Sequence, residues 1–200
     1  MRYDLFQRKC DFFYSVSKQG GYPQSNLAEI AFLGRSNVGK SSLIKALVNK
    51  KTVVRTSKTP GSTMQINYFN LGNKLLLVDL PGYGYIKQKR CIVEHLSYII
   101  EDYLKYRNNL QLLILVLDSR RNINKDEILL LKFLKKIKTN LLLVFNKIDK
   151  VKEDKLEDRE YIINYMCQNF SFIKDTISVS CTKGFGINKL KEKIINNINL

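Results

Sequence analysis

The stretch from Gly34 to Ser42 reads Gly-Arg-Ser-Asn-Val-Gly-Lys-Ser-Ser and matches the phosphate-binding pattern G-x-x-x-x-G-K-[ST]. An apolar run precedes it and a helical pattern follows it, which predicts a strand, a glycine loop and a helix. The N–H groups of such a loop surround a phosphate at a helix N-terminus. We expect Lys40 to reach the β- and γ-phosphates and Ser41 to offer its hydroxyl to Mg²⁺. A chance match is the alternative, and the flanking elements disfavour it.

A second stretch, Asp79-Leu80-Pro81-Gly82, follows another apolar run. A carboxylate at the end of a buried strand can hold Mg²⁺ directly or through water, and Gly82 has no side chain to shield its N–H from the γ-phosphate. A turn that begins with Asp is the alternative. In the loop between these stretches, the hydroxyl of Thr63 can complete the Mg²⁺ shell, with Thr59 and Ser62 as alternatives from spacing alone.

A third stretch, Asn146-Lys147-Ile148-Asp149, predicts the base. A carboxylate can accept two parallel hydrogen bonds, which guanine offers from N1–H and its N2 amino group and adenine does not. We expect Asn146 to tie this loop to the phosphate loop and the Lys147 stem to cover the base. A solvated loop is the alternative. After the last predicted strand, the N–H groups around Ser180 and Cys181 can meet guanine O6, which leaves Cys181 no redox role.

Six strands and five helices are predicted to position these loops. The predicted strands cover 29–33, 65–71, 74–80, 112–117, 141–145 and 173–179. The predicted helices cover 40–49, 91–107, 126–137, 153–169 and 187–198. Their alternation predicts an α/β fold with a mostly parallel six-stranded sheet and helices on both faces, and every motif falls at the carboxyl end of a strand. Residues 29–200 form one predicted domain, and residues 1–28 a lead-in packed on it, in which Phe12, Phe13, Tyr14 and Val16 can add a short edge element.

The composition is that of a globular chain, with 44% hydrophobic and 26% charged residues, but its charge is strongly basic. The 34 basic and 18 acidic residues give a formal net charge of +16, which attracts a polyanion, either nucleic acid or an anionic membrane. A lysine-rich proteome is the alternative explanation. We expect no membrane span, no signal peptide and no disulfide, and therefore a soluble cytoplasmic protein with four reduced cysteines.

Together these stretches resemble the EngB (YihA/YsxC) family of small bacterial-type GTPases. The residues that carry the resemblance extend over nearly the whole chain: Glu29 to Phe32, Gly34 to Ile44, Thr56 to Thr63, Gln65 to Phe69, Leu77 to Tyr85, Asp118 to Arg120 and Asn146 to Lys150. The resemblance implies a Ras-like G domain that binds GTP or GDP with Mg²⁺, held by Ser41 and Thr63. It also implies a role in assembly of the large ribosomal subunit, with its rRNA as partner, and in division and septation. The chain departs from the family pattern at two points: Ser62 stands where the family often has Arg, and the chain lacks the Trp that the family often has in the helix after the second switch.

These arguments predict the site residues by role. The predicted nucleotide contacts are Gly34, Arg35, Ser36, Asn37, Val38, Gly39, Lys40, Ser41, Ser42, Gly61, Ser62, Thr63, Met64, Gln65, Asp79, Leu80, Pro81, Gly82, Asn146, Lys147, Ile148, Asp149, Val179, Ser180 and Cys181. The predicted magnesium ligands are Ser41, Thr63 and Asp79. The predicted catalytic residues are Lys40, Thr63 and Gly82.

Tyr83 stands where Ras-type enzymes carry the Gln that orients the attacking water, so we predict slow hydrolysis that a partner completes. Asn37 lies where related GTPases hold a monovalent cation, which makes K⁺ stimulation a further expectation. Basic residues after Tyr83, Tyr85 and Ile86 favour a partner surface there over core. The alternative functions are an RNA-binding module with GTP as a structural ligand, and a division regulator that acts on proteins. We expect a monomer, although the sequence leaves the oligomeric state open.

Overall fold

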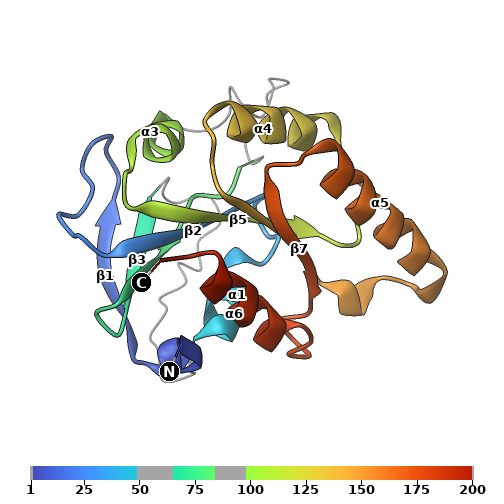
Figure 1. Ribbon diagram of the computed structural model, residues 1–200, viewed down its shortest axis with the longest axis horizontal. Coiled ribbons are helices and arrows are strands. Elements are labelled where there is room, and N and C mark those ends of the chain that lie inside the picture. Colours follow the sequence, from blue (N-terminus) through green and yellow to red (C-terminus); the bar gives the residue numbers. More distant parts are fainter. Residues whose placement is uncertain (1, 49–64, 84–97, 200) are drawn as a thin grey trace.

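The computed structural model of the 200-residue chain describes residues 2–48, 65–83 and 98–199 (Figure 1). Its sheet has seven strands in the order β1-β3-β4-β2-β5-β6-β7. The strands are β1 Cys10–Val16, β2 Ala28–Gly34, β3 Ile66–Leu71, β4 Leu75–Asp79, β5 Leu110–Asp118, β6 Leu141–Asn146 and β7 Ile173–Val179. Pairing is antiparallel from β1 through β3 to β4 and parallel from β4 to β7. The predicted α/β class with a mostly parallel sheet is confirmed.

The predicted count of six strands is one too few, because the short edge element expected in the lead-in from Phe12 to Val16 is a full strand of the sheet, β1. β1 pairs along β3, and its register shifts between Phe12 and Tyr14, where a β-bulge interrupts the alternation of side chains. Only Cys10 and Val16, at the two ends of the strand, are buried, whereas the three aromatic residues between them are exposed. An edge strand with a bulge therefore lacks the period-2 pattern by which the other strands were recognised.

Helices cover both faces of the sheet (Figure 1). The α-helices are α1 Lys40–Leu47, α3 Tyr98–Tyr106, α4 Lys125–Lys136, α5 Leu156–Asn169 and α6 Ile187–Asn196, and the 3₁₀ helices are η1 Arg2–Gln7, η2 Ile148–Lys150 and η3 Glu153–Lys155. One core cluster joins α1, α6 and η1 to the sheet, and a second joins α3, α4 and α5 to its other face. Because both faces are covered, the strands in the middle of the sheet are continuous apolar runs, as in β4 from Leu75 to Val78.

The predicted helices agree with the observed ones to within a few residues where the structure describes them. The first seven residues of the predicted helix 91–107 lie outside the described ranges, and α3 begins at Tyr98. A hairpin turn at Gly72 and Asn73 joins β3 to β4, with φ of 59° and 53° at the two residues. None of the helices in the described ranges is long and apolar enough to cross a bilayer.

The lead-in is fastened to α3 and to the chain that follows it. Glu29 is fully buried, and it accepts hydrogen bonds from Tyr103 Oη at 2.8 Å and Arg107 Nε at 2.9 Å. Arg107 Nη2 also donates to Pro23 O at 3.0 Å. Tyr22 Oη donates to Asp102 at 2.5 Å. These contacts hold residues 22–29 against the end of the sheet opposite to the loops that carry the sequence motifs.

Candidate functional site

The predicted motifs converge at the carboxyl ends of the parallel strands. The register pairs Gly34 of β2 with Val116 of β5. It also pairs Asp118 of β5 with Asn146 of β6, and Asn146 with Val179 of β7. Because neighbouring parallel strands end side by side, loops that are more than 100 residues apart in sequence leave the sheet along one edge.

The glycine loop between β2 and α1 is tightly packed at both of its glycines. A Cβ on Gly34 would lie 2.5 Å from Val116 O, and a Cβ on Gly39 would lie 2.4 Å from Asn146 Nδ2. Gly39 also has φ of 104°, which disfavours any side chain. The first N–H groups of α1, which begins at Lys40, have no partner within the helix, and they form the positive end of its dipole. This geometry suits an anion.

Lys40, which is buried, and Ser41 and Asp79, which are half-buried, form a polar group beside the loop. Lys40 Nζ donates to Gly34 O at 3.4 Å, and Ser41 Oγ donates to Asp79 Oδ2 at 2.8 Å. Burial lowers the pKa of Lys40, against the nearby charge of Asp79. Burial likewise raises the pKa of Asp79, against Lys40 and Ser41. Asp79 Oδ1 is buried and has no hydrogen-bond partner among the described residues, so this oxygen is available to a ligand.

The segment after β4 runs along the glycine loop. Leu80 N donates to Phe32 O at 3.1 Å, Ser36 N donates to Tyr83 O at 3.0 Å, and Tyr83 N donates to Gly34 O at 3.3 Å. A Cβ on Gly82 would lie 3.0 Å from the backbone N of Ser36. Gly82 is therefore required for the close approach of these two segments, a reason that the motif alone did not supply.

Tyr83 does not belong to an exposed surface, which corrects the expectation for this residue. Its side chain is 2% exposed and packs in the core cluster on the α3 and α4 side of the sheet. Its hydroxyl is buried and has no hydrogen-bond partner among the described residues. Burial, with the negative charge of Glu127, raises its pKa above the ordinary value. The backbone contacts with Gly34 and Ser36 turn the phenol into the core, whereas Tyr85 and Ile86 lie outside the described residues.

The Asn146 amide links the third motif to the glycine loop. Asn146 Nδ2 donates to Val38 O at 3.1 Å, and Asn146 Oδ1 accepts from Lys147 N at 2.8 Å. Lys147 Nζ donates to Asn37 O at 2.8 Å. The Cys181 thiol also donates to Asn146 Oδ1 at 3.3 Å, and burial raises the pKa of that thiol to about 11. Cys181 is therefore a protonated packing residue at neutral pH.

Asp149 is exposed at the far end of this loop. The Ser180 hydroxyl, with Lys150 and Thr182, keeps the pKa of Asp149 below its ordinary value, and Thr182 Oγ1 lies 3.5 Å from Asp149 Oδ2. The carboxylate is thus ionised at neutral pH, in the form that accepts two hydrogen bonds.

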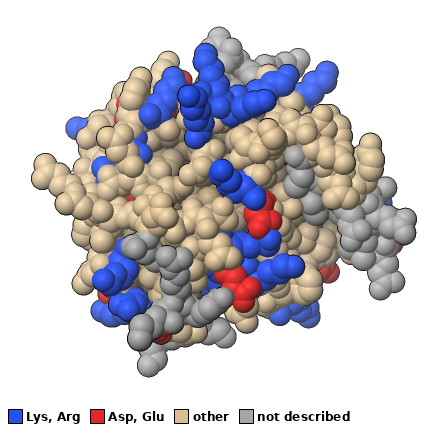
Figure 2. Space-filling view, viewed as in Figure 1, with Lys and Arg blue, Asp and Glu red and all other residues tan. Residues whose placement is uncertain are grey.

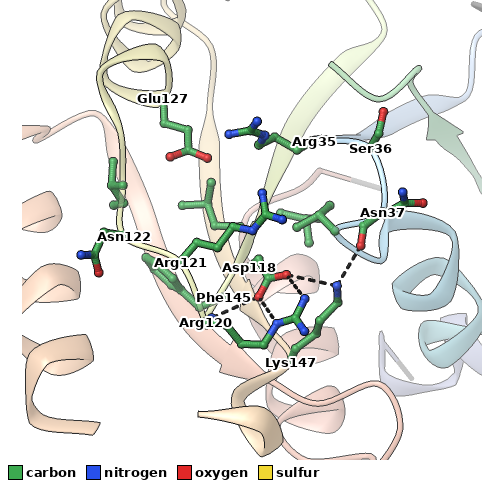
Figure 3. A pocket seen from close by; sticks show the side chains of 14 residues that line it. Arg35, Ser36, Asn37, Asp118, Arg120, Arg121, Asn122, Glu127, Phe145 and Lys147 are labelled. Atoms are coloured by element: carbon green, nitrogen blue, oxygen red, sulfur yellow. Dashed lines mark hydrogen bonds and ion pairs between the residues drawn. The ribbon is translucent and has the colours of Figure 1, made fainter. Parts of the chain in front are cut away.

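Asp118 and Arg120 are site residues that the sequence analysis did not single out as such. Arg120 binds Asp118 through two hydrogen bonds, from Nε at 2.9 Å and from Nη2 at 2.7 Å, and Lys147 Nζ donates to the same carboxylate at 3.1 Å (Figure 3). Burial would raise the pKa of Asp118, but these hydrogen bonds outweigh it and hold the pKa well below the ordinary value. The sequence signal was an Asp at the end of a buried strand.

The remaining predicted nucleotide contacts differ in their burial and in their neighbours. Gln65 precedes β3 and accepts a hydrogen bond from Ser15 Oγ of β1 at 3.1 Å. Leu80 and Val179 are buried, Pro81, Ile148 and Arg35 are half-buried, and Ser42 is exposed on the first turn of α1. Gly61, Ser62, Thr63 and Met64 lie outside the described residues, so the structure does not place them.

A family described as 50S ribosome-binding GTPase matches residues 29–147. The chain is 42% identical over 159 residues to the probable GTP-binding protein EngB of Citrifermentans bemidjiense, covering 80% of this chain and 74% of that protein. It is 41% identical over 170 residues to the protein of the same name in Clostridium kluyveri, covering 85% of this chain and 81% of that protein.

Solved structures show the same fold. The crystal structure of a probable GTP-binding protein EngB aligns with a TM-score of 0.63 and 29% identity, over 84% of this chain and 97% of that one. The structure of Era in complex with MgGDPNP and part of 16S ribosomal RNA aligns with a TM-score of 0.65 and 20% identity, over 87% of this chain and 57% of that one. The second likeness concerns the fold alone.

Proposed function

Since the chain belongs to the EngB family of GTP-binding proteins, we propose that it is a slow GTPase that acts as a nucleotide-dependent switch in assembly of the large ribosomal subunit. The observation that carries the proposal is the contact between Asn146 and Val38, which joins the phosphate loop and the base-recognition loop into one site. A site of this shape binds a nucleotide along its length, with the phosphates at α1 and the base at Asp149.

At the phosphate end, the residues present fit Mg²⁺. Ser41 and Asp79 offer oxygen ligands, which a hard cation prefers, and the unpaired Asp79 Oδ1 is a buried acceptor that a magnesium-bound water or the ion itself would satisfy. When bound, Mg²⁺ neutralises charge between the β- and γ-phosphates. In our proposal Ser41, Asp79 and the undescribed Thr63 hold the ion. Lys40, with Gly82 N–H, binds the γ-phosphate, and the N–H groups of residues 36–42 surround the β-phosphate.

At the base end, the proposal assigns guanine to Asp149. Its ionised carboxylate accepts from N1–H and from the N2 amino group, and adenine would leave the same carboxylate without a donor. The hydrogen bond from Lys147 Nζ to Asn37 O stretches the Lys147 side chain between the two loops, where its stem can cover the base. Of the residues Val179 to Cys181 proposed beside guanine O6, Ser180 already donates its N–H to Phe185 O at 3.0 Å, so we propose the Cys181 N–H as the donor to O6.

The burial of Tyr83 supports slow hydrolysis. Ras-type enzymes orient the attacking water with a Gln at this position, and a phenol that packs 2% exposed in the core cannot reach that water. We propose that a group from outside the chain completes the reaction, and the particle on which the protein acts is the natural source. We also propose that Asn37, exposed on the glycine loop, helps to hold K⁺ beside the phosphates.

The net charge of +16 and the ribosome-binding description of the matched family support the large subunit and its rRNA as partners. We propose that the protein acts as a monomer in the cytoplasm and that loss of this role disturbs division and septation. The test is cosedimentation with large ribosomal subunits in GTP, GDP or no nucleotide. We expect binding that is strongest with GTP. Binding that is absent, or equal in all three conditions, contradicts a switch.

The buried Tyr83 is also compatible with a second function, an RNA- or protein-binding division regulator in which GTP is a structural ligand. Phosphate release in a single turnover distinguishes the two. A GTPase switch releases phosphate slowly alone, faster with large subunits, and faster in K⁺ than in Na⁺ if K⁺ takes part. A structural ligand remains intact in all these conditions.

A further inference from the structure

A pocket of about 160 Å³ lies on the α4 side of the glycine loop. It shares the predicted nucleotide contacts Arg35 to Val38 and Lys147 with the candidate nucleotide site, but Lys40, Ser41, Asp79 and Asp149 do not line it. We call it the arginine pocket, because Arg35 from the glycine loop and Arg120 and Arg121 from the segment after β5 point into it (Figure 3). Its volume is several times the ~30 Å³ that one water molecule occupies in the liquid, so it has room for a phosphate group.

The arginine pocket carries an excess of positive charge. Arg35, Arg120, Arg121 and Lys147 face two carboxylates, Asp118 and Glu127. Both carboxylates are already engaged within the protein. Asp118 binds Arg120 and Lys147, and Glu127, which is 8% exposed, accepts from the backbone N of Asn124 at 2.9 Å and caps α4. Glu127 also attracts Arg35 and Arg121, so two carboxylates face four cationic groups, and this excess of positive charge favours a bound anion.

An apolar groove continues from the arginine pocket between α4 and α5, and Asn122 and Ile123 line both. Its wall on α5 carries Tyr161 and Tyr165, which are four residues apart and therefore share one helix face. Their side chains are 72% and 47% exposed, unusual for two neighbouring aromatic rings. Beyond the groove, basic side chains gather over α3 and α4 at the top of the view (Figure 2), where α4 exposes Lys125, Lys132, Lys135 and Lys136.

We propose that the arginine pocket and the α4–α5 groove together bind single-stranded RNA, with a backbone phosphate at the arginines and bases stacked on Tyr161 and Tyr165. Exposed aromatic rings beside a cationic site are the combination that single-stranded nucleic acid uses, because each base has an aromatic face and each linkage a negative charge. An acidic peptide would match the charge but would leave the tyrosines without a role. The choice of RNA rests on the ribosomal partner of the proposed function.

The arginine pocket is also connected to the nucleotide site through Asp118. Arg120 and Lys147 share this carboxylate, and Lys147 in turn donates to Asn37 O of the glycine loop. A phosphate that draws Arg120 from Asp118 changes how strongly Asp118 holds Lys147. RNA and guanine nucleotide should therefore alter each other's affinity by the same factor.

The test is fluorescence anisotropy of the full chain with a labelled oligouridine of about 12 nucleotides, within the ~4–16 nucleotides that single-strand sites span. We expect Tyr161→Ala/Tyr165→Ala to weaken binding about tenfold or more, since stacking contributes ~1–3 kcal/mol per base and 1.4 kcal/mol is tenfold. Tyr161→Phe/Tyr165→Phe keeps the rings and should bind like the unsubstituted protein. Arg121→Gln should weaken binding and lower the salt slope by about one between ~50 and 200 mM salt. Arg8→Gln, at the exposed end of the lead-in far from α5, is the charge-matched control.

Unchanged nucleotide affinity of the tyrosine variants establishes that they are folded. The proposal is overturned if the double alanine variant binds oligouridine like the unsubstituted protein. It is also overturned if polyglutamate displaces oligouridine from the double alanine variant and from the unsubstituted protein equally well. Cosedimentation separates this result from the proposed function. If the protein binds large subunits but the tyrosine and Arg121 variants bind oligouridine normally, the RNA site is wrong and the ribosomal role stands. If the protein never binds large subunits but these variants lose affinity for oligouridine, the ribosomal role is wrong and the RNA site stands.

Discussion

At the phosphate end of the site each polar side chain has few partners among the described residues, so replacing one of them should change ligand binding in its own way. Ser41 donates to the Asp79 carboxylate, whose other oxygen has no hydrogen-bond partner in the part of the chain that the structure describes. Lys40 lies 9% exposed against the Gly34 carbonyl. Such a group binds an ion or phosphate with little rearrangement, because the protein has already removed these polar atoms from water.

Replacing the Ser41 hydroxyl should reveal the metal site. We expect Ser41→Ala to weaken GDP binding roughly 10- to 100-fold in Mg²⁺, since hydrogen bonds to charged groups contribute about 1.5–3 kcal/mol. With a chelator present, the variant and the unsubstituted protein should bind alike. Titration with fluorescent GDP measures both. Ser41→Thr keeps the hydroxyl and should restore the magnesium dependence. An equal loss with and without Mg²⁺ would show a defect in folding rather than in metal binding.

The burial of the Cys10 thiol predicts how the stability of the protein depends on pH. Burial raises the pKa of Cys10 from 9.0 to about 12, with the charge of Asp11 adding to the effect. The folded thiol therefore keeps its proton between these values while the unfolded thiol loses it, so stability is complete below pH 9 and falls as pH rises above it.

Urea unfolding at pH 7 and pH 10 measures this fall. Other groups titrate in the same range, so the useful quantity is a difference between proteins. Cys10→Val lacks the thiol and should lose less stability over this interval than the unsubstituted chain. The same loss in both proteins would exclude Cys10 as a contributor.

At the scale of elements, α1 and β6 meet through the glycine loop and the Asn146 amide. Gly39 is the residue before α1, and its missing Cβ leaves the space that Asn146 occupies. The same amide accepts the Lys147 N–H, so one side chain sets the position of two loops. A change at Gly39 should therefore reach the base end of the site as well as the phosphate end.

Gly39→Ala tests this coupling, and Gly184→Ala is its matched control. Both glycines have positive φ, 104° and 71°, but a Cβ at Gly184 meets nothing within 4 Å. We expect Gly184→Ala to destabilise the fold by about 1–2 kcal/mol through backbone strain alone, with normal nucleotide affinity. Gly39→Ala should cost more and abolish tight nucleotide binding. Calorimetric unfolding and nucleotide titration measure the two effects. Similar nucleotide affinities would contradict the role of the Asn146 contact.

At the scale of the whole molecule, the lead-in contributes the edge strand β1 and is fastened at the end of the sheet opposite to the nucleotide site. Tyr22 and Pro23 of the lead-in bind Asp102 and Arg107, and Arg107 also forms an almost entirely buried ion pair with Glu29 at the start of the G domain. We propose that the lead-in and the G domain unfold together for this reason, because a buried charge cannot lose its partner without a large penalty.

Removing one partner tests this proposal. Arg107→Met leaves Glu29 as an unpaired buried charge and should destabilise the protein by about 3–5 kcal/mol in urea unfolding. Lys105 lies two residues before Arg107 and forms an exposed ion pair with Glu101, so Lys105→Met should change stability little. Arg107→Met/Glu29→Met removes both charges and should recover part of the loss. Separate unfolding transitions for the lead-in and the rest of the chain would contradict a single cooperative unit.

The loops of the site could be predicted from the sequence because each is contiguous. Spacing within Gly34 to Ser42, or within Asn146 to Asp149, specifies which atoms can meet a phosphate or a base. Their position after apolar runs places them at strand ends. The parallel sheet with helices on both faces followed from the same runs, since strands covered on both faces are apolar throughout.

Only the tertiary structure decided what depends on residues far apart in the chain. The pairing of the lead-in strand with β3 and its bulge, the burial of Tyr83, and the sharing of Asp118 by Arg120 and Lys147 all depend on such contacts. An edge strand with a bulge has no periodic signal, and a tyrosine after a glycine suits a surface as well as a core. Such outcomes are set by which surfaces meet when the sheet assembles, and that information is absent from local spacing.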